Sequence, residues 1–311
     1  MRYPNRRKTL DRRKFIGECT AAATAVAAGM GAAACRADTR SKNAESTEPP
    51  PRPGDWWEEG RYVDHRAVNS SRQSEGIIRA FVDGRWTDYK TVSLPRRFVD
   101  WNLQKRIEGL DKLARVGFDH EDLDGPHNGC VATYGGWKRD SVTSLNTAYK
   151  GMGFVPKAER LEETLAELTD ASKRMRDPSG FGSIDDMFNR TEFLRVLYSD
   201  RERFDLTKQV SLELFASPTF ATHTFLNMMA NPIASISFLA FPTFEIRAVP
   251  ELLHPDNPKL DAYRKNIIAY VNGIHDFAHG GRDRRMTCVY HVLEVYNDSP
   301  GEPGGQGKRI A

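Results

Sequence analysis

The sequence lacks the short motifs that identify most cofactor and nucleophile sites. It has only four cysteines and no C-x-x-C or C-x-x-C-H, which removes the sequence case for a thioredoxin-like site, a cysteine-held zinc or a c-type haem. It also has no P-loop, G-x-G-x-x-G, G-x-S-x-G or H-E-x-x-H. Nucleotide loops, hydrolase elbows and zinc-protease helices are therefore not indicated.

Beyond its N-terminal segment, the chain carries almost no net charge. The whole chain carries 45 basic and 42 acidic residues, and residues 1–34 contain seven of the basic and two of the acidic ones. The remainder has 38 basic and 40 acidic residues, a formal charge of −2. We therefore expect no nucleic-acid partner and no general attraction to anionic membranes.

The N-terminus contains the most specific pattern in the sequence. Arg12 and Arg13 precede a weakly apolar stretch, residues 15–34, that ends in small residues suited to cleavage. This order resembles the signal read by the bacterial twin-arginine translocation system. The resemblance implies that the translocase exports the chain already folded, often around a cofactor, to the periplasm or the outer face of the membrane. Glu18 makes the stretch a poor transmembrane helix.

Cys35 directly follows these alanines and resembles the lipid-bearing cysteine of a lipoprotein signal, although Ala32 replaces the usual Leu. Residues 36–53 are rich in Ser, Asn, Glu, Thr and Pro and nearly free of apolar side chains. Such a composition cannot build a core and is typical of a tether. Lipid attachment at Cys35 and simple cleavage with release are both open.

Four segments are expected along the chain. They are a signal peptide over residues 1–34, a disordered tether over 35–54, a single globular domain over 55–300 and a disordered Gly- and Pro-rich tail over 301–311. About 255 residues follow the tether, which is enough for one sizeable core.

Strand patterns near both ends of the domain, with helical patterns between them, predict an α+β fold with a mixed or antiparallel sheet and several packed helices. Asp83-Gly84 predicts a hairpin over residues 76–94. Residues 286–296 predict a strand with Val289, His291, Leu293 and Val295 on one face. Helices are predicted over 101–116, 157–175, 183–198 and 258–278, and a loop over 117–137. Strands are favoured over 208–249, although the apolar residues 219–241 fit a buried strand or a buried helix.

Cys130 and Cys288 are the cysteines that remain in the domain, because Cys19 lies in the signal. In an oxidising compartment they are candidates for a disulfide. Two separate buried thiols are the alternative.

A histidine pair gives the sharpest chemical hypothesis. His275 and His279 are four residues apart on the clearest predicted helix, so their rings share one face. His291 is a candidate third ligand and His223 an alternative to it, and three histidines suit a transition metal with an open position. Two histidines could equally meet a haem edge. The alternative is chance spacing, with His279 favoured by the dipole at a helix C-terminus.

Two charged loops are further candidates. Arg282, Arg284 and Arg285 follow a Gly-Gly helix end and could hold a phosphate or carboxylate, or could simply rim a solvated turn. The acidic loop over residues 119–124 with His127 could bind calcium, but its spacing departs from the EF-hand and favours a solvated loop.

Two functions remain open. One is an exported metal- or haem-dependent oxidoreductase built on the histidine pair. The other is a lipid-tethered, non-catalytic binding or accessory protein of the cell envelope, supported by Cys35, the tether and the missing catalytic motifs. The sequence identifies no substrate or small-molecule ligand.

Overall fold

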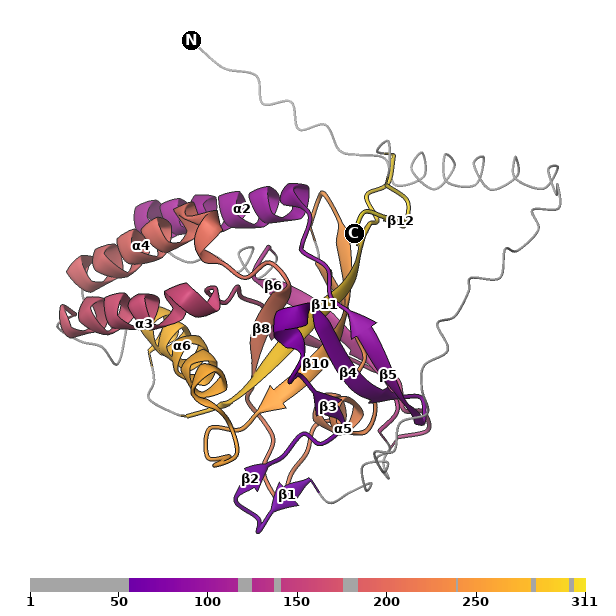
Figure 1. The fold of residues 1–311 in the computed structure, drawn as a ribbon. Coiled ribbons are helices and arrows are strands. Elements are labelled where there is room, and N and C mark those ends of the chain that lie inside the picture. Colours follow the sequence, from indigo (N-terminus) through magenta and orange to yellow (C-terminus); the bar gives the residue numbers. More distant parts are fainter. Residues whose placement is uncertain are drawn as a thin grey trace. The chain divides into compact units, whose positions relative to one another are not determined.

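The computed structural model describes residues 56–116, 125–136, 141–175, 184–238, 240–280, 284–301 and 305–311. Within these ranges the chain forms the predicted α+β arrangement, with five α-helices and antiparallel sheets. Figure 1 shows helices α2, α3, α4 and α6 gathered beside the strands, with α5 lying apart from them.

The strands are β1 (Trp57–Glu58), β2 (Tyr62–Val63), β3 (Val68–Asn69), β4 (Ile77–Val82), β5 (Arg85–Lys90), β6 (Asn128–Thr133), β7 (Asn146–Gly151), β8 (Lys208–Glu213), β9 (Ala234–Phe238), β10 (Phe244–Leu253), β11 (Met286–Asn297) and β12 (Lys308–Arg309). The helices are α2 (Arg96–Val116), α3 (Ala158–Lys173), α4 (Ile184–Ser199), α5 (His223–Ala230) and α6 (Ala262–His279), with 3-10 turns η1 (Gln73–Glu75) and η3 (Arg201–Arg203).

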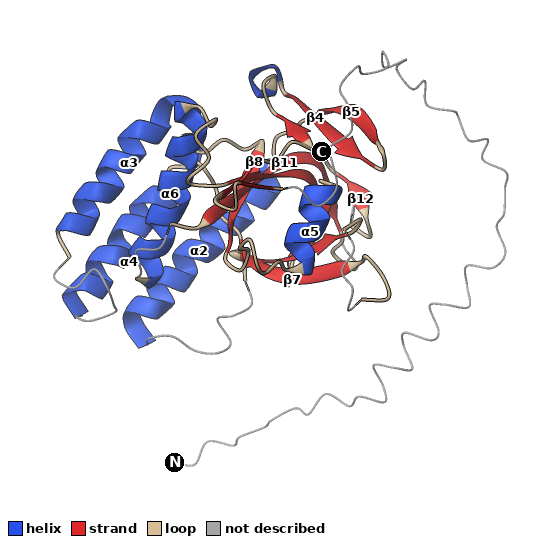
Figure 2. Cartoon of the chain, turned by 90° about the horizontal axis from the view of Figure 1, so that it is seen from below, coloured by secondary structure: helices blue, strands red, loops and turns tan. Residues whose placement is uncertain are grey.

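The main sheet curls until its two ends meet. Its strand order is β12-β11-β10-β9-β6-β7, and β8 pairs with β11 on the edge that β12 also uses. Just beyond β7, Gly153 forms a bridge with Val210 of β8 through two backbone hydrogen bonds of 2.7 and 2.9 Å. The sheet therefore has an inner and an outer face, and Figure 2 shows its curvature.

Apolar side chains fill the inner face. Val131, Ile236 and Ile246, from three neighbouring strands, are fully buried in one cluster. Phe98 of α2 joins it, with its ring centroid 5.4 Å from that of Phe238 and from that of Phe244. Aromatic pairs at this spacing add to the hydrophobic stabilisation and fix α2 against the sheet.

Two separate covers bury the outer face. Helices α3 and α6 pack through Leu161 and Ile267 on strand residues that include Val210 and Val289. The small sheet β3-β4-β5 packs through Ile78, Ala80 and Val82 on Val249 and Leu293. The predicted hairpin is confirmed as β4 and β5, and its turn residues Asp83 and Gly84 have φ of 50° and 79°, as a type I′ turn requires.

A β-bulge changes which residues of β11 face inward. The register between β10 and β11 shifts at Arg247/Ala248, and Leu293 is the extra residue. Val292 and Val295 therefore both join the inner core, while Leu293 lies under the hairpin. The prediction that Val295 shares a face with Leu293 is wrong, because an extra residue reverses the alternation beyond it.

Two other segments differ from the sequence prediction. Residues 128–133, predicted as loop, form β6 between β7 and β9. Gly129 there is a close-packing position, since a Cβ would lie 2.8 Å from side-chain atoms of Ile236 and Met152. Residues 223–230, predicted as strand, form α5, which Thr222 caps by accepting a hydrogen bond from the Phe225 N–H at 3.1 Å.

The predicted disorder of the tail is wrong for its last residues. Lys308 and Arg309 pair with Asn297 and Tyr296 of β11. The Ile310 N–H also donates to the Val295 carbonyl at 2.7 Å. The edge of β11 provides hydrogen-bond partners for the backbone of the tail. The polar composition of the tail alone gives no sign of this pairing.

Candidate functional site

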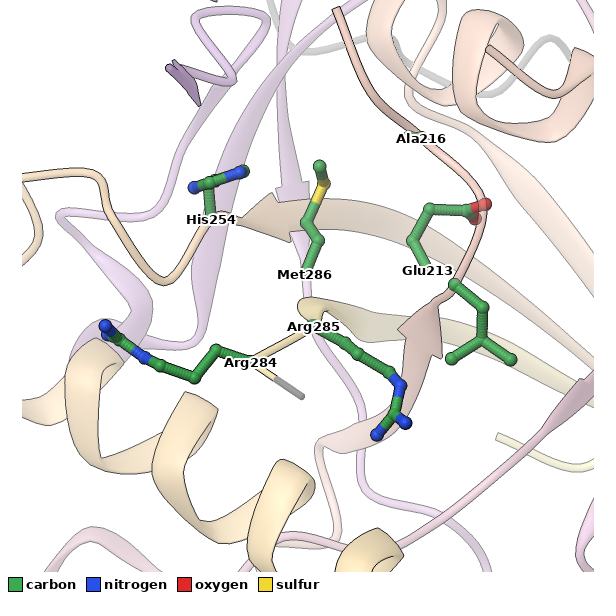
Figure 3. Close-up of a pocket in the computed structure, with 7 residues that line it drawn as sticks. Glu213, Ala216, His254, Arg284, Arg285 and Met286 are labelled. Atoms are coloured by element: carbon green, nitrogen blue, oxygen red, sulfur yellow. The ribbon is translucent and has the colours of Figure 1, made fainter. Parts of the chain in front are cut away.

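A pocket of about 250 Å³ opens where β8 ends and β11 begins. Its lining residues come from these two strands, the loops after β8 and β10, and the residues just before β11: Glu213, Leu214, Ala216, His254, Arg284, Arg285 and Met286. Figure 3 shows Arg284 on the side of His254 and Arg285 on the side of Glu213. The pocket thus combines polar walls with an apolar part, as ligand sites usually do.

Glu213 forms a buried, paired part of the lining. Its side chain is 1% exposed, and its Oε2 lies 2.6 Å from the Lys150 ammonium of β7. Its Oε1 accepts a hydrogen bond from the Thr222 hydroxyl at 3.3 Å. The carboxylate therefore joins β7, β8 and the N-terminus of α5, and its charge is compensated without a ligand.

His254 and Arg284 supply hydrogen-bond donors. The Asp256 N–H donates to His254 Nδ1 at 3.1 Å, so the neutral ring carries its proton on Nε2. Burial lowers the pKa of His254, against an opposing effect of Asp256, which keeps the ring neutral at pH 7. The Arg284 guanidinium donates to the Pro255 carbonyl at 3.1 Å and to Asp256 Oδ1 at 3.3 Å, and its side chain is 70% exposed.

Arg285 is held more tightly than Arg284. Its backbone N–H donates to Asn272 Oδ1 at 2.8 Å. Its guanidinium lies 3.1 Å from Asp276 Oδ1 and 3.2 Å from His275 Nδ1. Of the predicted anion-binding arginines, Arg284 and Arg285 thus line one pocket, and Arg282 lies outside the described residues.

The two histidines of the predicted pair are close in space. The ring centroids of His275 and His279 are 5.1 Å apart. Burial lowers the pKa of His279, and the neighbouring His275 and Arg190 lower it further. The Arg285 guanidinium lies 3.2 Å from His275 Nδ1, and the Asp276 carboxylate lies 3.4 Å from the same atom, so His275 has neighbours of both signs.

His291 does not join this pair. Its Nε2 lies 2.9 Å from Glu251 Oε2, and the residue is 1% exposed. His223 is the first residue of α5. Within the part of the chain that the structure describes, no group of three or more His, Cys, Asp or Glu side chains is placed to hold a metal ion. The predicted three-histidine set is not assembled there.

Glu251 and His291 belong instead to a buried cluster, the outer-face network, made of Ser70, Glu251, Arg264 and His291. Glu251 Oε1 accepts hydrogen bonds from the Ser70 hydroxyl at 2.6 Å and from Arg264 Nε at 3.1 Å. Burial alone would raise the pKa of Glu251, but His291, Arg264 and Ser70 together lower it to about 2. This network links the residue after β3 with β10, β11 and α6, and none of its four members lines the pocket.

The predicted disulfide between Cys130 and Cys288 is wrong, because both thiols are free. Cys130 lies on β6 and Cys288 on β11, with β9 and β10 between them. Three strand spacings amount to roughly 14 Å, well beyond the Cα separation of about 7 Å that a disulfide tolerates.

The remaining sequence candidates divide in two. Arg12, Arg13, Cys35 and the acidic loop over 119–124 lie outside the described residues. The turn Tyr134-Gly135-Gly136 packs on α5: the Gly136 N–H donates to Asn227 Oδ1 at 2.8 Å, and a Cβ at Gly136 would lie 2.5 Å from the Leu226 backbone. These glycines allow close packing and do not line the pocket.

Sequence reasoning missed Glu213 and His254 as site residues. Glu213 ends a strand segment that was predicted, and His254 follows the next long one. Strand ends that carry polar side chains were the available signal, but no spacing linked two positions 41 residues apart.

Searches against protein-family models, curated proteins and solved structures found no match. Among the described residues, none of the helices has the length and apolar character needed to cross a bilayer.

Proposed function

We propose that this chain is an exported binding protein of the cell envelope, tethered through Cys35, that takes a small anionic ligand in the pocket beside His254 and Arg284. The observation that carries the proposal is that one pocket is lined by His254, with its neutral Nε2–H, and by Arg284, whose exposed guanidinium is shared with Asp256. A carboxylate or phosphate accepts hydrogen bonds from both types of donor.

The rest of the lining defines the ligand further. Leu214, Ala216 and Met286 also line the pocket, but most of its accessible lining is polar, so a small anion with little apolar surface fits best. About 250 Å³ is below the usual range for drug-sized ligands, which begins near 300 Å³. The twin-arginine signal and the tether supply the location in this proposal.

The alternative of a metal- or haem-dependent oxidoreductase has weaker support. It requires a cofactor at His275 and His279, and His275 Nδ1 is already in contact with the Arg285 guanidinium and the Asp276 carboxylate. The binding function needs neither a metal nor a nucleophile.

Calorimetric titration of the exported protein with hexanoate and with inorganic phosphate tests the proposal. We expect binding of at least one probe, and a loss of affinity of about tenfold in Arg284→Ala and in His254→Ala, since each removes a hydrogen bond to a charged group. Arg247→Ala is the matched control, because this exposed arginine is paired with Glu245 and Glu294 far along β10. The proposal would be contradicted if neither probe bound, or if Arg247→Ala lost as much affinity as the two pocket variants.

A further inference from the structure

Exposed apolar side chains are concentrated at the pocket end of the domain. Ten large apolar side chains are exposed in the described part of the chain, and six of them come from two segments. We call these six the apolar rim: Val142, Leu145 and Tyr149, from residues 141–149, and Leu214, Phe215 and Phe220, from the β8–α5 loop. Isolated exposed apolar residues are ordinary, whereas a cluster indicates an interaction surface.

Hydrogen bonds and an ion pair hold the two segments together. Lys150, next to Tyr149, pairs with Glu213, next to Leu214, at 2.6 Å. Asn146 Nδ2 donates to the Thr224 hydroxyl at 2.7 Å on α5. Since the β8–α5 loop leads directly into α5, the rim residues surround one structural corner.

A further bond fixes the first segment on α5. Asn227 Nδ2 donates to the Ser144 carbonyl at 2.7 Å. The side chains of Leu145 and Tyr149 nevertheless remain 68% exposed. The backbone is thus held in place while the apolar groups point away from the core, which is the arrangement expected of a contact surface.

The first described residues of the domain lie at the same corner. The ring of Trp56 lies 6.0 Å from that of Phe225 on α5. The ring of Trp57 lies 6.3 Å from that of Phe225 and 5.5 Å from that of His254 in the pocket. The point where the predicted tether joins the domain is therefore next to both the pocket and α5.

The length of the chain before this point limits its distance from a lipid anchor. Twenty residues separate Cys35 from Trp56. A flexible tether of twenty residues, which the composition of this segment predicts, would span roughly 25 Å on average, less than the width of a domain of this size. An acyl chain on Cys35 would therefore keep the pocket corner, rather than the helical side, close to the membrane surface.

We propose that the apolar rim docks on the outer surface of the bilayer that holds Cys35, so that the pocket opens at the lipid surface. Phe215 and Phe220 would enter the region between headgroups and acyl chains, where aromatic side chains are favoured. The domain has little net charge, so the interaction should not require anionic lipid. This inference rests on the envelope location in the proposed function but not on ligand binding.

Flotation of the exported chain with phosphatidylethanolamine–phosphatidylglycerol vesicles tests the rim. Cys35→Ser is used throughout, so that no attached lipid contributes. We expect the parent to float with the vesicles and its partition coefficient to fall at least about tenfold in Phe215→Asp/Phe220→Asp, because two apolar contacts with lipid are lost.

Phe188→Asp/Val196→Asp is the matched control. Both residues are similarly exposed, at 62% and 59%, but lie on α4, which both cartoon views place in the helical group away from α5. We expect this control to float like the parent. Circular dichroism verifies folding, and replacing phosphatidylglycerol with phosphatidylcholine should leave the rim effect unchanged.

Three results would overturn the inference: a parent that does not float, an equal loss in the α4 control, or flotation that disappears without anionic lipid. Hexanoate and phosphate titrations of the same proteins separate this inference from the proposed function. Retained ligand binding with no flotation rejects only the rim, whereas flotation with no ligand binding rejects only the pocket.

Discussion

The outer-face network and the pocket both contain Glu, His and Arg side chains, yet they differ in how these polar groups are bonded and exposed. In the network, Glu251 is bonded to Ser70, Arg264 and His291. In the pocket, the guanidinium of Arg284 is largely exposed, and the proton of His254 lies on Nε2. The enclosed charges connect elements of the fold, whereas Arg284 and His254 at the pocket keep part of their surface exposed.

The largest expected effect is at the centre of the enclosed cluster. Glu251→Ala should lower the free energy of unfolding by about 3–5 kcal/mol, because it leaves His291 buried without its carboxylate partner and removes one of the two carboxylates that bind Arg264. Denaturant unfolding followed by circular dichroism measures this. Glu251→Gln, which keeps one oxygen acceptor, should lose less. A loss below about 1 kcal/mol in Glu251→Ala would remove the distinction between the two clusters.

A second prediction compares two histidines that are buried to different extents. His65 Nδ1 accepts from the Leu252 N–H and its Nε2 lies 3.0 Å from the Met228 carbonyl. Burial lowers the pKa of His65 to about 4, from an ordinary 6.5. The unfolded chain thus binds more protons between these values, so stability falls as the pH drops from 6.5 to 4, by about 3 kcal/mol.

Unfolding measured at several pH values checks this change. His65→Gln removes the titrating ring and should flatten the pH dependence of the unfolding free energy between pH 6.5 and 4. His254→Gln, in the pocket, should change the pH dependence of the unfolding free energy less, because His254 is only partly enclosed. Equal pH dependence in the parent and in His65→Gln would count against a neutral, buried His65.

The smallest expected effect is at the exposed arginine of the pocket. Arg284→Ala should change the free energy of unfolding by less than about 0.5 kcal/mol, because its ion pair with Asp256 is solvent-exposed. Arg264→Ala, in the enclosed cluster, should cost several times more. Thermal and denaturant unfolding of both variants measure the contrast, and similar losses would contradict it.

Local patterns predicted the elements whose signals lie within a few residues. The apolar stripe of α6, the alternation of β11 and the Asp83-Gly84 turn each specify their element without distant contacts. The residues of β6 gave no such signal. Gly129 and Cys130 were interpreted as loop, and only pairing with both β7 and β9 makes them strand.

The candidate site was predictable only in part. Arg284 and Arg285 were identified from their place after a helix end, and they do line the pocket. The other members depend on how the sheet curls, which brings residue 213 beside residue 254. For His291, the strand face was correct, but its partner Glu251 comes from a different strand and could not be read from spacing along the chain.

One edge of the long strand β11 depends on short segments for its pairing. One side of it is fully paired with β10, whereas the other is shared by β8 and the short β12. Without residues 308–311, the backbone groups near Val295 would be left open to recruit a strand from another molecule. Residues 308–311 thus cover this part of the β11 edge. We expect a tag or truncation that displaces them to promote aggregation.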